Sequence, residues 1–403
     1  MAQKNQKVLI FSLTYLPFIG GAEIAVQEIT KRLVGDFEFE MITCNLDGKQ
    51  KDEEQLGNVK VYRIGKGRIG KHLFHLLAFK KALELHRKNN YSGVWSIMAN
   101  RAGLAALSFK KKFPNVKFLL TLQEGDSVFD IWKKTWYMRP LYKNIYRRAD
   151  YIQVISNFLA KRARKYGYKK EISVVPNGVD IEKFKNQNSK IKIKENLNIG
   201  PEEKIILTDS RLVKKNGVAD LIKAFQLLVT PASPSARFDS ARREAGRANY
   251  ELRVTLLILG AGPLANQLKS LAVKLGLQDK IIFLGAIPYD QIQNYYSIAD
   301  VFVRPSLTEG FGNVFVQAMA AKIPVVATPV GGIIDFLKDG ETGWFCQPKN
   351  PESIADKIRY ILAEKNTDEV SRVVETAQKM VIEKYTWDSV AQKMRNIFNS
   401  LIF

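Results

Sequence analysis

One loop in the second half of the sequence combines a carboxylate with closely spaced glycines at the expected start of a helix. Residues 304–321 read RPSLTEGFGNVFVQAMAA and join an expected strand to an expected helix. Gly310 and Gly312 allow the chain to curl, so backbone amides near Gly312 to Val314 would point outward, where a helix N-terminus stabilises phosphate charge. The Glu309 carboxylate is a good acceptor for sugar hydroxyls. This loop predicts a site for a ligand that bears phosphate and hydroxyl groups.

The first turn of the expected helix adds two polar side chains. Gln317 lies four residues after Asn313, so one helical turn separates them and both could face the same ligand. A purely structural interpretation is equally compatible with the composition: Asn313 would then be a helix N-cap and the helix would be buried.

A second loop places cations where a diphosphate could be bound. Residues 208–217 read TDSRLVKKNG and lie between an expected strand and an expected helix. Arg211 offers a planar, permanently charged fork, and Lys214 and Lys215 add two point charges. The alternative is an exposed basic loop, but a strand's C-terminal end on the side of Glu309 favours ligand binding.

Two further glycine pairs precede expected helices. Gly20 and Gly21 follow the first strand, and Gly-Gly before a helix is more often a simple turn than an anion site. The turn from Gly260 to Gly262 fits a dinucleotide fingerprint, but the next strand ends in Gly285-Ala286 and lacks the acid that would bind a ribose. Contact with another nucleotide and a structural turn both stay open for Gly262.

Strands and helices that alternate along the chain must position these loops. The expected strands are Val8–Leu13, Phe39–Thr43, Val59–Ile64, Val94–Met98, Val116–Leu122, Tyr151–Ile155 and Ile172–Val175, then Lys204–Thr208, Val254–Leu259, Ile281–Leu284, Val301–Arg304 and Val325–Ala327. Helix-length amphipathic stretches separate most of them, which is the pattern of doubly wound parallel sheets. The sequence therefore predicts an α/β protein with two Rossmann-like domains that face a central cleft.

A polar stretch rich in Lys and Asn, residues 180–198, marks the expected domain boundary. We expect domains at 1–182 and 183–384, and a C-terminal helix at 385–403 that packs back toward the first domain. Residues 230–250 interrupt the rhythm with small and charged side chains, which predicts a mobile surface insertion.

The composition excludes several classes of protein. The chain has 403 residues and an apolar fraction of 46%, so disorder, collagen and disulfide scaffolds are excluded. The two cysteines, Cys44 and Cys346, predict neither a disulfide framework nor a paired metal motif, and favour a reducing cytoplasm. No apolar run approaches the roughly 18 residues of a membrane span, so we expect a soluble or peripheral protein.

Positive charge is concentrated in the first half of the chain. The net formal charge is +22, of which residues 1–180 hold +16. Residues 131–148 contain no acid and interleave Trp and Tyr with Lys and Arg, a mixture suited to an anionic membrane surface. A basic helix that covers a core is the alternative. No motif supports nucleic-acid binding.

Taken together and in order, the motifs resemble those of the retaining glycosyltransferases of family 4, which have the GT-B fold. The resemblance spans nearly the whole chain. Its markers are Gly20-Gly21, Val154–Asn157, Val175–Asp180, Ser210–Val213, Gly260–Pro263, Glu309–Gly312, Gln317–Ala320, Pro324–Thr328, Gly331-Gly332 and Gly340–Gly343.

The resemblance implies transfer of a hexose from a UDP- or GDP-sugar, with retained anomeric configuration and without a required metal or other cofactor. The second domain would bind the donor, and the first would bind a polysaccharide, glycolipid or lipid-linked acceptor. Arg211 and Lys215 would neutralise the leaving diphosphate, and Glu309 would bind the donor sugar. The other implied donor-binding residues are Gly20, Gly21, Lys214, Gly262, Gly310, Phe311, Gly312, Asn313, Val314 and Gln317.

Three positions depart from the family pattern. A paired glutamate is replaced by Gln317, which would hold the nucleotide ribose, and the usual lysine before Gly217 is replaced by Asn216. An N-terminal histidine on the acceptor side is also replaced, which leaves Gln123, Glu124 and Asp126 as candidates. Two other functions stay open: a nucleotide-sugar epimerase of the same fold, and a catalytically weak relative that binds sugar nucleotides.

Overall fold

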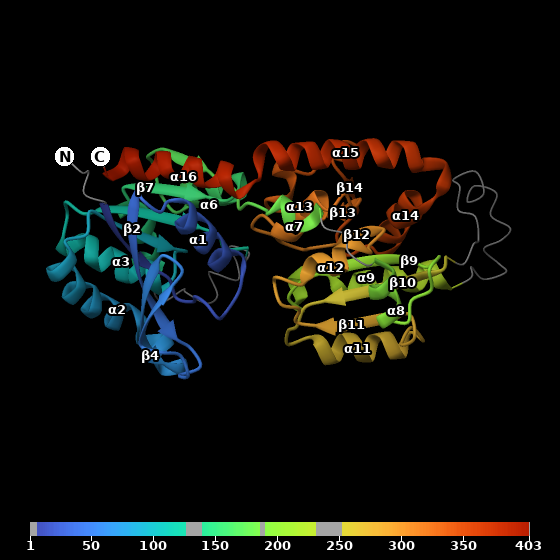
Figure 1. Cartoon of the computed structure of the whole chain (residues 1–403), viewed down its shortest axis with the longest axis horizontal. Coiled ribbons are helices and arrows are strands. Elements are labelled where there is room, and N and C mark those ends of the chain that lie inside the picture. Colours follow the sequence, from blue (N-terminus) through green and yellow to red (C-terminus); the bar gives the residue numbers. More distant parts are fainter. Residues whose placement is uncertain (1–5, 126–138, 186–189, 231–251, 403) are drawn as a thin grey trace. The chain divides into compact units, whose positions relative to one another are not determined.

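The computed structural model describes residues 6–125, 139–185, 190–230 and 252–402. The chain forms two compact units, which Figure 1 shows in colours that follow the sequence. The first comprises Met1–Gly178 and Tyr385–Phe403, and the second comprises Val179–Lys384. Asp126 and, apart from Thr230, the predicted insertion at 230–250 lie outside the described residues.

The first unit contains an eight-stranded sheet in the order β3-β4-β2-β1-β5-β6-β7-β8. Its strands are β1 (Gln6–Phe11), β2 (Phe37–Asn45), β3 (Glu53–Leu56), β4 (Val59–Lys66), β5 (Gly93–Ile97), β6 (Lys117–Leu122), β7 (Tyr151–Val154) and β8 (Ile172–Val174). All neighbours pair in parallel except β3, which is antiparallel to β4. Central strands are covered on both faces, which explains why Val8 to Phe11 are all apolar and fully buried.

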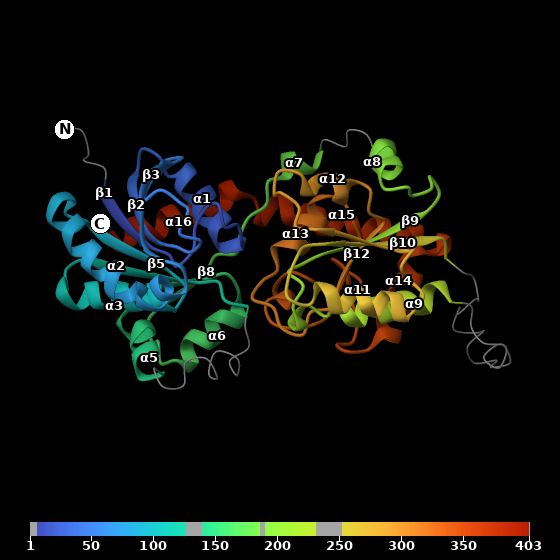
Figure 2. The same ribbon diagram turned by 90° about the horizontal axis from the view of Figure 1, so that it is seen from below.

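Helices cover both faces of this sheet (Figure 2). They are α1 (Gly21–Arg32), α2 (Gly67–Asn89), α3 (Arg101–Lys112), α5 (Arg139–Arg148), α6 (Asn157–Lys165) and α16 (Trp387–Ile402). α2 packs on α3 and α3 on α5, whereas α1 packs on α16. The tail helix belongs to this unit because the ring of Phe398 lies 5.2 Å from that of Phe37 and 5.3 Å from that of Trp95, between centroids.

The second unit contains a six-stranded parallel sheet in the order β11-β10-β9-β12-β13-β14. Its strands are β9 (Lys204–Asp209), β10 (Val254–Leu259), β11 (Ile281–Gly285), β12 (Val301–Arg304), β13 (Val325–Ala327) and β14 (Trp344–Phe345). Its helices are α7 (Ile181–Lys185), α8 (Lys190–Asn196), α9 (Val218–Val229), α11 (Ala265–Lys274), α12 (Ile292–Ser297), α13 (Asn313–Ala320), α14 (Pro351–Leu362) and α15 (Thr367–Lys384).

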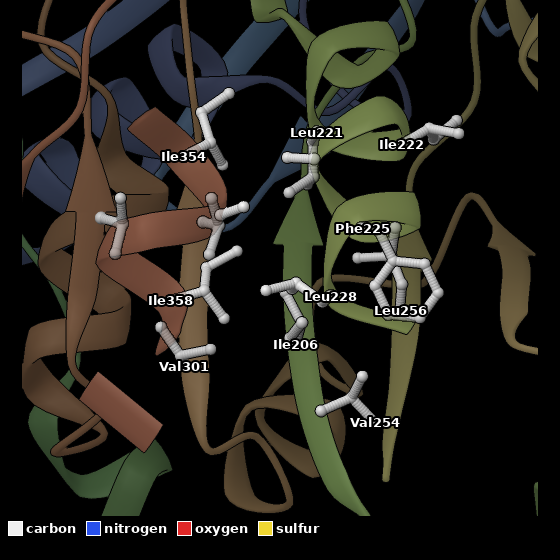
Figure 3. Close-up of a cluster of buried hydrophobic side chains, with 14 of the residues drawn as sticks. Ile206, Leu221, Ile222, Phe225, Leu228, Val254, Leu256, Val301, Ile354 and Ile358 are labelled. Carbon is white, nitrogen blue, oxygen red and sulfur yellow. The ribbon is translucent and has the colours of Figure 1, made fainter. Parts of the chain in front are cut away.

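One face of the second sheet carries a cluster of buried apolar side chains. Figure 3 shows Ile206, Val254 and Val301 from the strands facing side chains of α9 and α14. Phe225 of α9 and Ile358 of α14 are fully buried in this cluster. α13 packs on α15, and Figure 2 shows these two helices on the opposite side of the sheet from α9 and α14.

The strand order of the second sheet creates a topological switch point. β9 lies in the middle, with β10 on one side and β12 on the other. In doubly wound sheets, ligands bind outside the carboxyl ends of the strands at this point, because the chain leaves the two central strands in opposite directions. The loops after β9 and β12 both leave from this edge.

Most differences from the predicted elements concern short or polar segments. β3 and the two-residue β14 were not predicted, and both α7 and α8 lie within the polar stretch at 180–198, where no element was expected. In α5, Tyr142 and Tyr146 are buried at 8% and 4% exposed. This part of 131–148 is therefore a basic helix over a core, whereas Trp132, Trp136 and Tyr137 lie outside the described residues. Among the described helices, none is long and apolar enough to cross a membrane.

Candidate active site

The loops after β9 and β12 meet through their backbones. The Leu307 amide donates a hydrogen bond to the Lys215 carbonyl at 2.6 Å. Gly217, with φ of +69°, starts α9, and a Cβ at this position would lie 2.0 Å from the Pro305 carbonyl oxygen. Only glycine tolerates both this backbone conformation and this approach. The two predicted ligand-binding loops are thus held side by side.

A chain of side-chain hydrogen bonds runs from one loop to the other. Asn216 Nδ2 donates to the Arg211 carbonyl at 2.6 Å, and Asn216 Oδ1 accepts from Arg304 Nη2 at 2.9 Å. The same Nη2 donates to Glu309 Oε2 at 2.5 Å. The other carboxylate oxygen, Oε1, accepts from the Gly310 amide at 3.0 Å. Arg211, Asn216, Arg304 and Glu309 therefore form one connected network, to which the sequence analysis had not assigned Arg304.

Burial separates the members of this group into a framework and an exposed edge. Asn216, Arg304 and Glu309 are 2%, 8% and 9% exposed, so their hydrogen bonds are largely shielded from water. Arg211 and Lys214 are exposed, and Lys215 is half-buried. A shielded carboxylate and surface cations on one sheet edge suit a ligand that has both hydroxyl groups and a charged diphosphate.

A second carboxyl group lies near Arg304. Burial raises the pKa of Asp209, the last residue of β9, from its ordinary value of 3.8 to about 6. A hydrogen bond from the Tyr296 hydroxyl, at 3.1 Å, and the positive charge of Arg304 act in the opposite direction. Burial and the nearby Asp209 raise the pKa of Tyr296 well above its usual range. Beside the network there is thus a buried group of interacting ionisable side chains, Asp209, Tyr296 and Arg304.

The start of α13 differs in detail from the expectation. Gly312 is the N-cap and has no side chain to cap the helix, so the alternative in which Asn313 is the N-cap is wrong. Asn313 is the first helical residue, and it is partly exposed like Val314. Gln317, one turn further on, is 5% exposed. The first helical residues are thus partly accessible, while Gln317 lies largely beneath the surface.

Residues around Glu309 are fixed from two further directions. The Gly332 amide donates to the Glu309 carbonyl at 3.1 Å, and a Cβ on Gly331, whose φ is +61°, would lie 1.9 Å from that oxygen. Phe311 is buried and its ring lies 5.1 Å from that of Phe336, between centroids. The loop after β13 therefore holds the backbone that presents the carboxylate.

The turn at Gly262 packs against the same region. A Cβ on Gly262 would lie 2.5 Å from the Leu212 carbonyl oxygen, and Leu264 donates a backbone hydrogen bond to that carbonyl at 3.1 Å. Close packing accounts for this glycine. Beside it lies a cavity of about 250 Å³, whose lining includes Lys214, Leu264 and Leu307.

In the first unit, the Gly20-Gly21 turn is partly occupied by the chain's own acid. Gly20 is the N-cap of α1, and the Glu23 carboxylate accepts a hydrogen bond from Thr14. Burial raises the pKa of Glu23, while hydrogen bonds from Thr14 and from the backbone amides of Glu23 and Gly20 lower it. A carboxylate thus already lies at this helix start.

The acceptor-side candidates that the structure describes are held by internal bonds. Gln123 Oε1 accepts from Asn177 at 3.0 Å. Glu124 Oε1 accepts from the Ala99 amide at 2.7 Å, whereas its Oε2 is buried without a hydrogen-bond partner. Burial raises the pKa of Glu124, and the charge of Arg162 is among the effects that lower it. Throughout the described part of the chain, no group of three or more His, Cys, Asp or Glu side chains could hold a metal ion.

Comparisons with known families match almost the whole chain. The model of "Glycosyltransferase Family 4" matches residues 19–183, and that of "Glycosyl transferases group 1" matches residues 189–380. This chain belongs to the family 4-like glycosyltransferases of the GT-B fold. The two matches correspond to the two α/β units, so this glycosyltransferase has the fold that the sequence predicts.

The similarity of this glycosyltransferase to its relatives extends over nearly its whole length. An uncharacterized glycosyltransferase of Methanocaldococcus jannaschii is 27% identical over 97% of each chain. A GDP-mannose-dependent alpha-(1-6)-phosphatidylinositol monomannoside mannosyltransferase of Mycobacterium tuberculosis is 25% identical over 96% of this chain and 97% of its own. The structure of HepE from Anabaena in complex with UDP-glucose has a TM-score of 0.78 at 19% identity, covering 98% of this chain and 100% of that one.

One member of this glycosyltransferase's network was missed by sequence reasoning. Arg304 ends a strand whose other residues, Val301 to Val303, are fully buried and apolar. A cation that ends such a strand needs a partner, and the next acid along the chain is Glu309, in the loop that the strand enters. The pairing of Arg304 with Glu309 could therefore have been predicted from the sequence.

Proposed function

We propose that this glycosyltransferase moves a hexose from a UDP- or GDP-sugar to a glycan or lipid-linked acceptor, with retention of configuration and without a metal ion. The observation that supports it is the network that ties the cationic loop after β9 to the carboxylate after β12. Both loops lie at the switch point of the sheet, where nucleotides bind in doubly wound folds.

The charges suit the departure of a nucleoside diphosphate. When the bond between the sugar and the diphosphate breaks, negative charge grows on the leaving group, and groups that stabilise this charge lower the barrier. Arg211 and Lys214 are exposed on the loop after β9, with Lys215 beside them. In our proposal these side chains and the partly exposed N-terminus of α13 supply the positive potential that a metal ion provides elsewhere.

The carboxylate of Glu309 would fix the donor sugar. One of its oxygens accepts from Arg304 and the other from the Gly310 amide. Each carboxylate oxygen can accept a second hydrogen bond, so hydroxyl groups of a hexose can still be bound. The names of relatives support both donor classes, since one is GDP-mannose-dependent and one was solved with UDP-glucose. The name of the mycobacterial relative also suggests a membrane glycolipid as acceptor, since that enzyme acts on a phosphatidylinositol monomannoside.

A donor screen with product analysis tests this proposal. The full chain is incubated with UDP- and GDP-hexoses, with and without lipid extracts, and release of nucleoside diphosphate is measured with and without EDTA. We expect release that EDTA does not reduce and a product whose anomeric configuration matches the donor by NMR. A product with inverted configuration contradicts the proposed retention, and loss of activity in EDTA contradicts the proposed independence of a metal ion. Isomerisation of the donor without an acceptor indicates an epimerase, and donor binding without any turnover indicates an inactive relative.

For the acceptor side, we propose that α2 contacts an anionic membrane surface. Ile69, Leu73 and Leu76 are 74%, 45% and 57% exposed, and their spacing places them on one face of the helix. Arg68 and Lys71 are exposed on the same helix. Apolar side chains flanked by cations bind the headgroup boundary of anionic bilayers. This helix would bring the first unit to a lipid-linked acceptor.

Sedimentation with vesicles tests the membrane contact. The wild type should sediment with vesicles of anionic lipid at low salt and be released by high salt. The double variant Leu73→Gln/Leu76→Gln should lose most of this binding. Ile191→Gln, which changes an equally exposed isoleucine in the second unit, is the control and should bind as the wild type does. Equal sedimentation of both variants contradicts the assignment to α2.

A further inference from the structure

Arg304 is a buried cation whose bonding capacity is only partly used. It ends β12, is 8% exposed, and donates hydrogen bonds to both Asn216 and Glu309 through one nitrogen, Nη2. Its Nε is buried and has no hydrogen-bond partner. The guanidinium lies 5.6 Å from the centroid of the Phe315 ring, which supports it from α13. Such a group is expensive to bury and is kept in place from two loops and a helix.

Its location connects the loop after β9 with the loop after β12. Through Asn216 it reaches the carbonyl of Arg211, and through Glu309 it reaches the amide of Gly310. In the family pattern that this sequence resembles, position 216 is a lysine. Here it is Asn216, and the buried cation bonded to it is Arg304, which comes from β12. A neutral side chain at position 216 suits a cation at position 304, because a lysine in place of Asn216 would put two positive charges next to each other.

We propose that Arg304 is a positioning residue for the transfer reaction, which rests on the proposed function. It orients the Glu309 carboxylate toward the donor sugar and holds the turn that carries Arg211. Its positive charge takes the place of the lysine that position 216 lacks.

This role makes a kinetic prediction that a packing role does not. A residue needed only for folding changes the amount of active protein and its melting temperature, whereas the kcat and KM of the folded fraction stay the same. A positioning residue changes the folded enzyme itself. Since Glu309 would act on the sugar as charge develops, loss of its orientation should lower kcat more than it raises KM.

The experiment compares four variants in the donor assay. Arg304→Met removes the charge, Arg304→Lys keeps the charge without the fork, and Asn216→Lys/Arg304→Met returns a cation from the other loop. Arg359→Met, which changes an arginine on α14 paired with Asp356, is the control. Melting temperatures and active-protein fractions are measured for all four.

We expect Arg304→Met to lower kcat on the order of 100-fold, with KM for the donor within about threefold. Arg304→Lys should retain more activity, and Asn216→Lys/Arg304→Met should recover at least about 10-fold over Arg304→Met. The control should behave as the wild type. Rescue by a cation from position 216 supports the proposal even if Arg304→Met itself folds poorly, because the double variant keeps the same loss at 304.

Two results overturn the inference while leaving the proposed function intact. One is an active wild type in which Arg304→Met keeps its normal kcat. The other is an Asn216→Lys/Arg304→Met variant that folds but is no more active than Arg304→Met. A wild type that neither transfers nor hydrolyses any donor is a different outcome, since it overturns the proposed function and this inference with it.

Discussion

Replacing Asp209 with asparagine should stabilise the protein near neutral pH, because the native fold keeps this carboxylate ionised at a cost. Burial raises the pKa of Asp209 from 3.8 to about 6 even though Tyr296 and Arg304 favour its charged form. A folded-state pKa above the unfolded-state value means that the folded protein binds the proton more tightly. Its stability is therefore reduced above pH 6 and recovers as the pH falls toward 3.8.

The size of the effect follows from the shift. About two pKa units correspond to ~3 kcal/mol of unfolding free energy at pH 7.5, and the penalty falls to about half of that at pH 5. Asparagine has the same shape and can still accept the hydrogen bond that Tyr296 donates at 3.1 Å. Asp209→Asn should therefore gain ~2–3 kcal/mol at pH 7.5 and about half of that at pH 5.

Urea unfolding of the wild type and the variant at both pH values measures this difference. Asp290→Asn, which neutralises an exposed aspartate in the same unit, is the control and should change stability by less than about 0.5 kcal/mol. An equal gain at pH 7.5 and pH 5 would show that the charge of Asp209 is not the cause. A loss of stability at pH 7.5 would refute the electrostatic reasoning as a whole.

Three further predictions concern the site and its surroundings. Arg211→Ala changes an exposed side chain, so it should leave the free energy of unfolding within about 0.5 kcal/mol but lower the initial rate of transfer 10²–10³-fold. Glu309→Gln should lower that rate to a similar degree. A near-normal rate in either variant would remove that residue from the site. Gly331→Ala should lower the free energy of unfolding by at least ~3 kcal/mol, because the new Cβ would clash with the Glu309 carbonyl. Gly276→Ala is the comparison: its φ is also positive, at +69°, but the space around it is open, so denaturant titration should show a loss of only ~1 kcal/mol. Burial raises the pKa of Cys346 to about 12, so maleimide at pH 8 should label it only after unfolding, and rapid native labelling contradicts this.

The fold was predictable wherever the sequence carries a long apolar run. Val254 to Leu259 are all buried in β10, and Val301–Arg304 has the predicted bounds, because strands covered on both faces contain few polar residues. β3 escaped prediction since its sequence, EEQL, lies at a half-exposed edge and has no apolar face. α8 escaped because KIKIKEN alternates like a strand and buries no residue.

Within the site, the sequence predicts which loops matter but not how their side chains pair. Asn216 looked like a lost lysine, and only the structure shows that it joins Arg211 to Arg304. Such pairing depends on the approach of segments almost 90 residues apart, which local patterns do not encode. Similarly, the tyrosines of α5 suited both a membrane surface and a core, and their burial depends on packing against other elements.

The contacts at Gly217 and Gly331 have a consequence for how this site can change over time. At both positions a neighbouring carbonyl oxygen occupies the space where a side chain would begin. At these two points the frame of the site is main chain packed against main chain, and the side chains that face a ligand are mounted on it. Substitutions among those side chains can alter donor preference without refitting the loops, whereas the two glycines cannot be exchanged. Directed evolution of a new donor specificity should accordingly accumulate changes around these glycines and none at them.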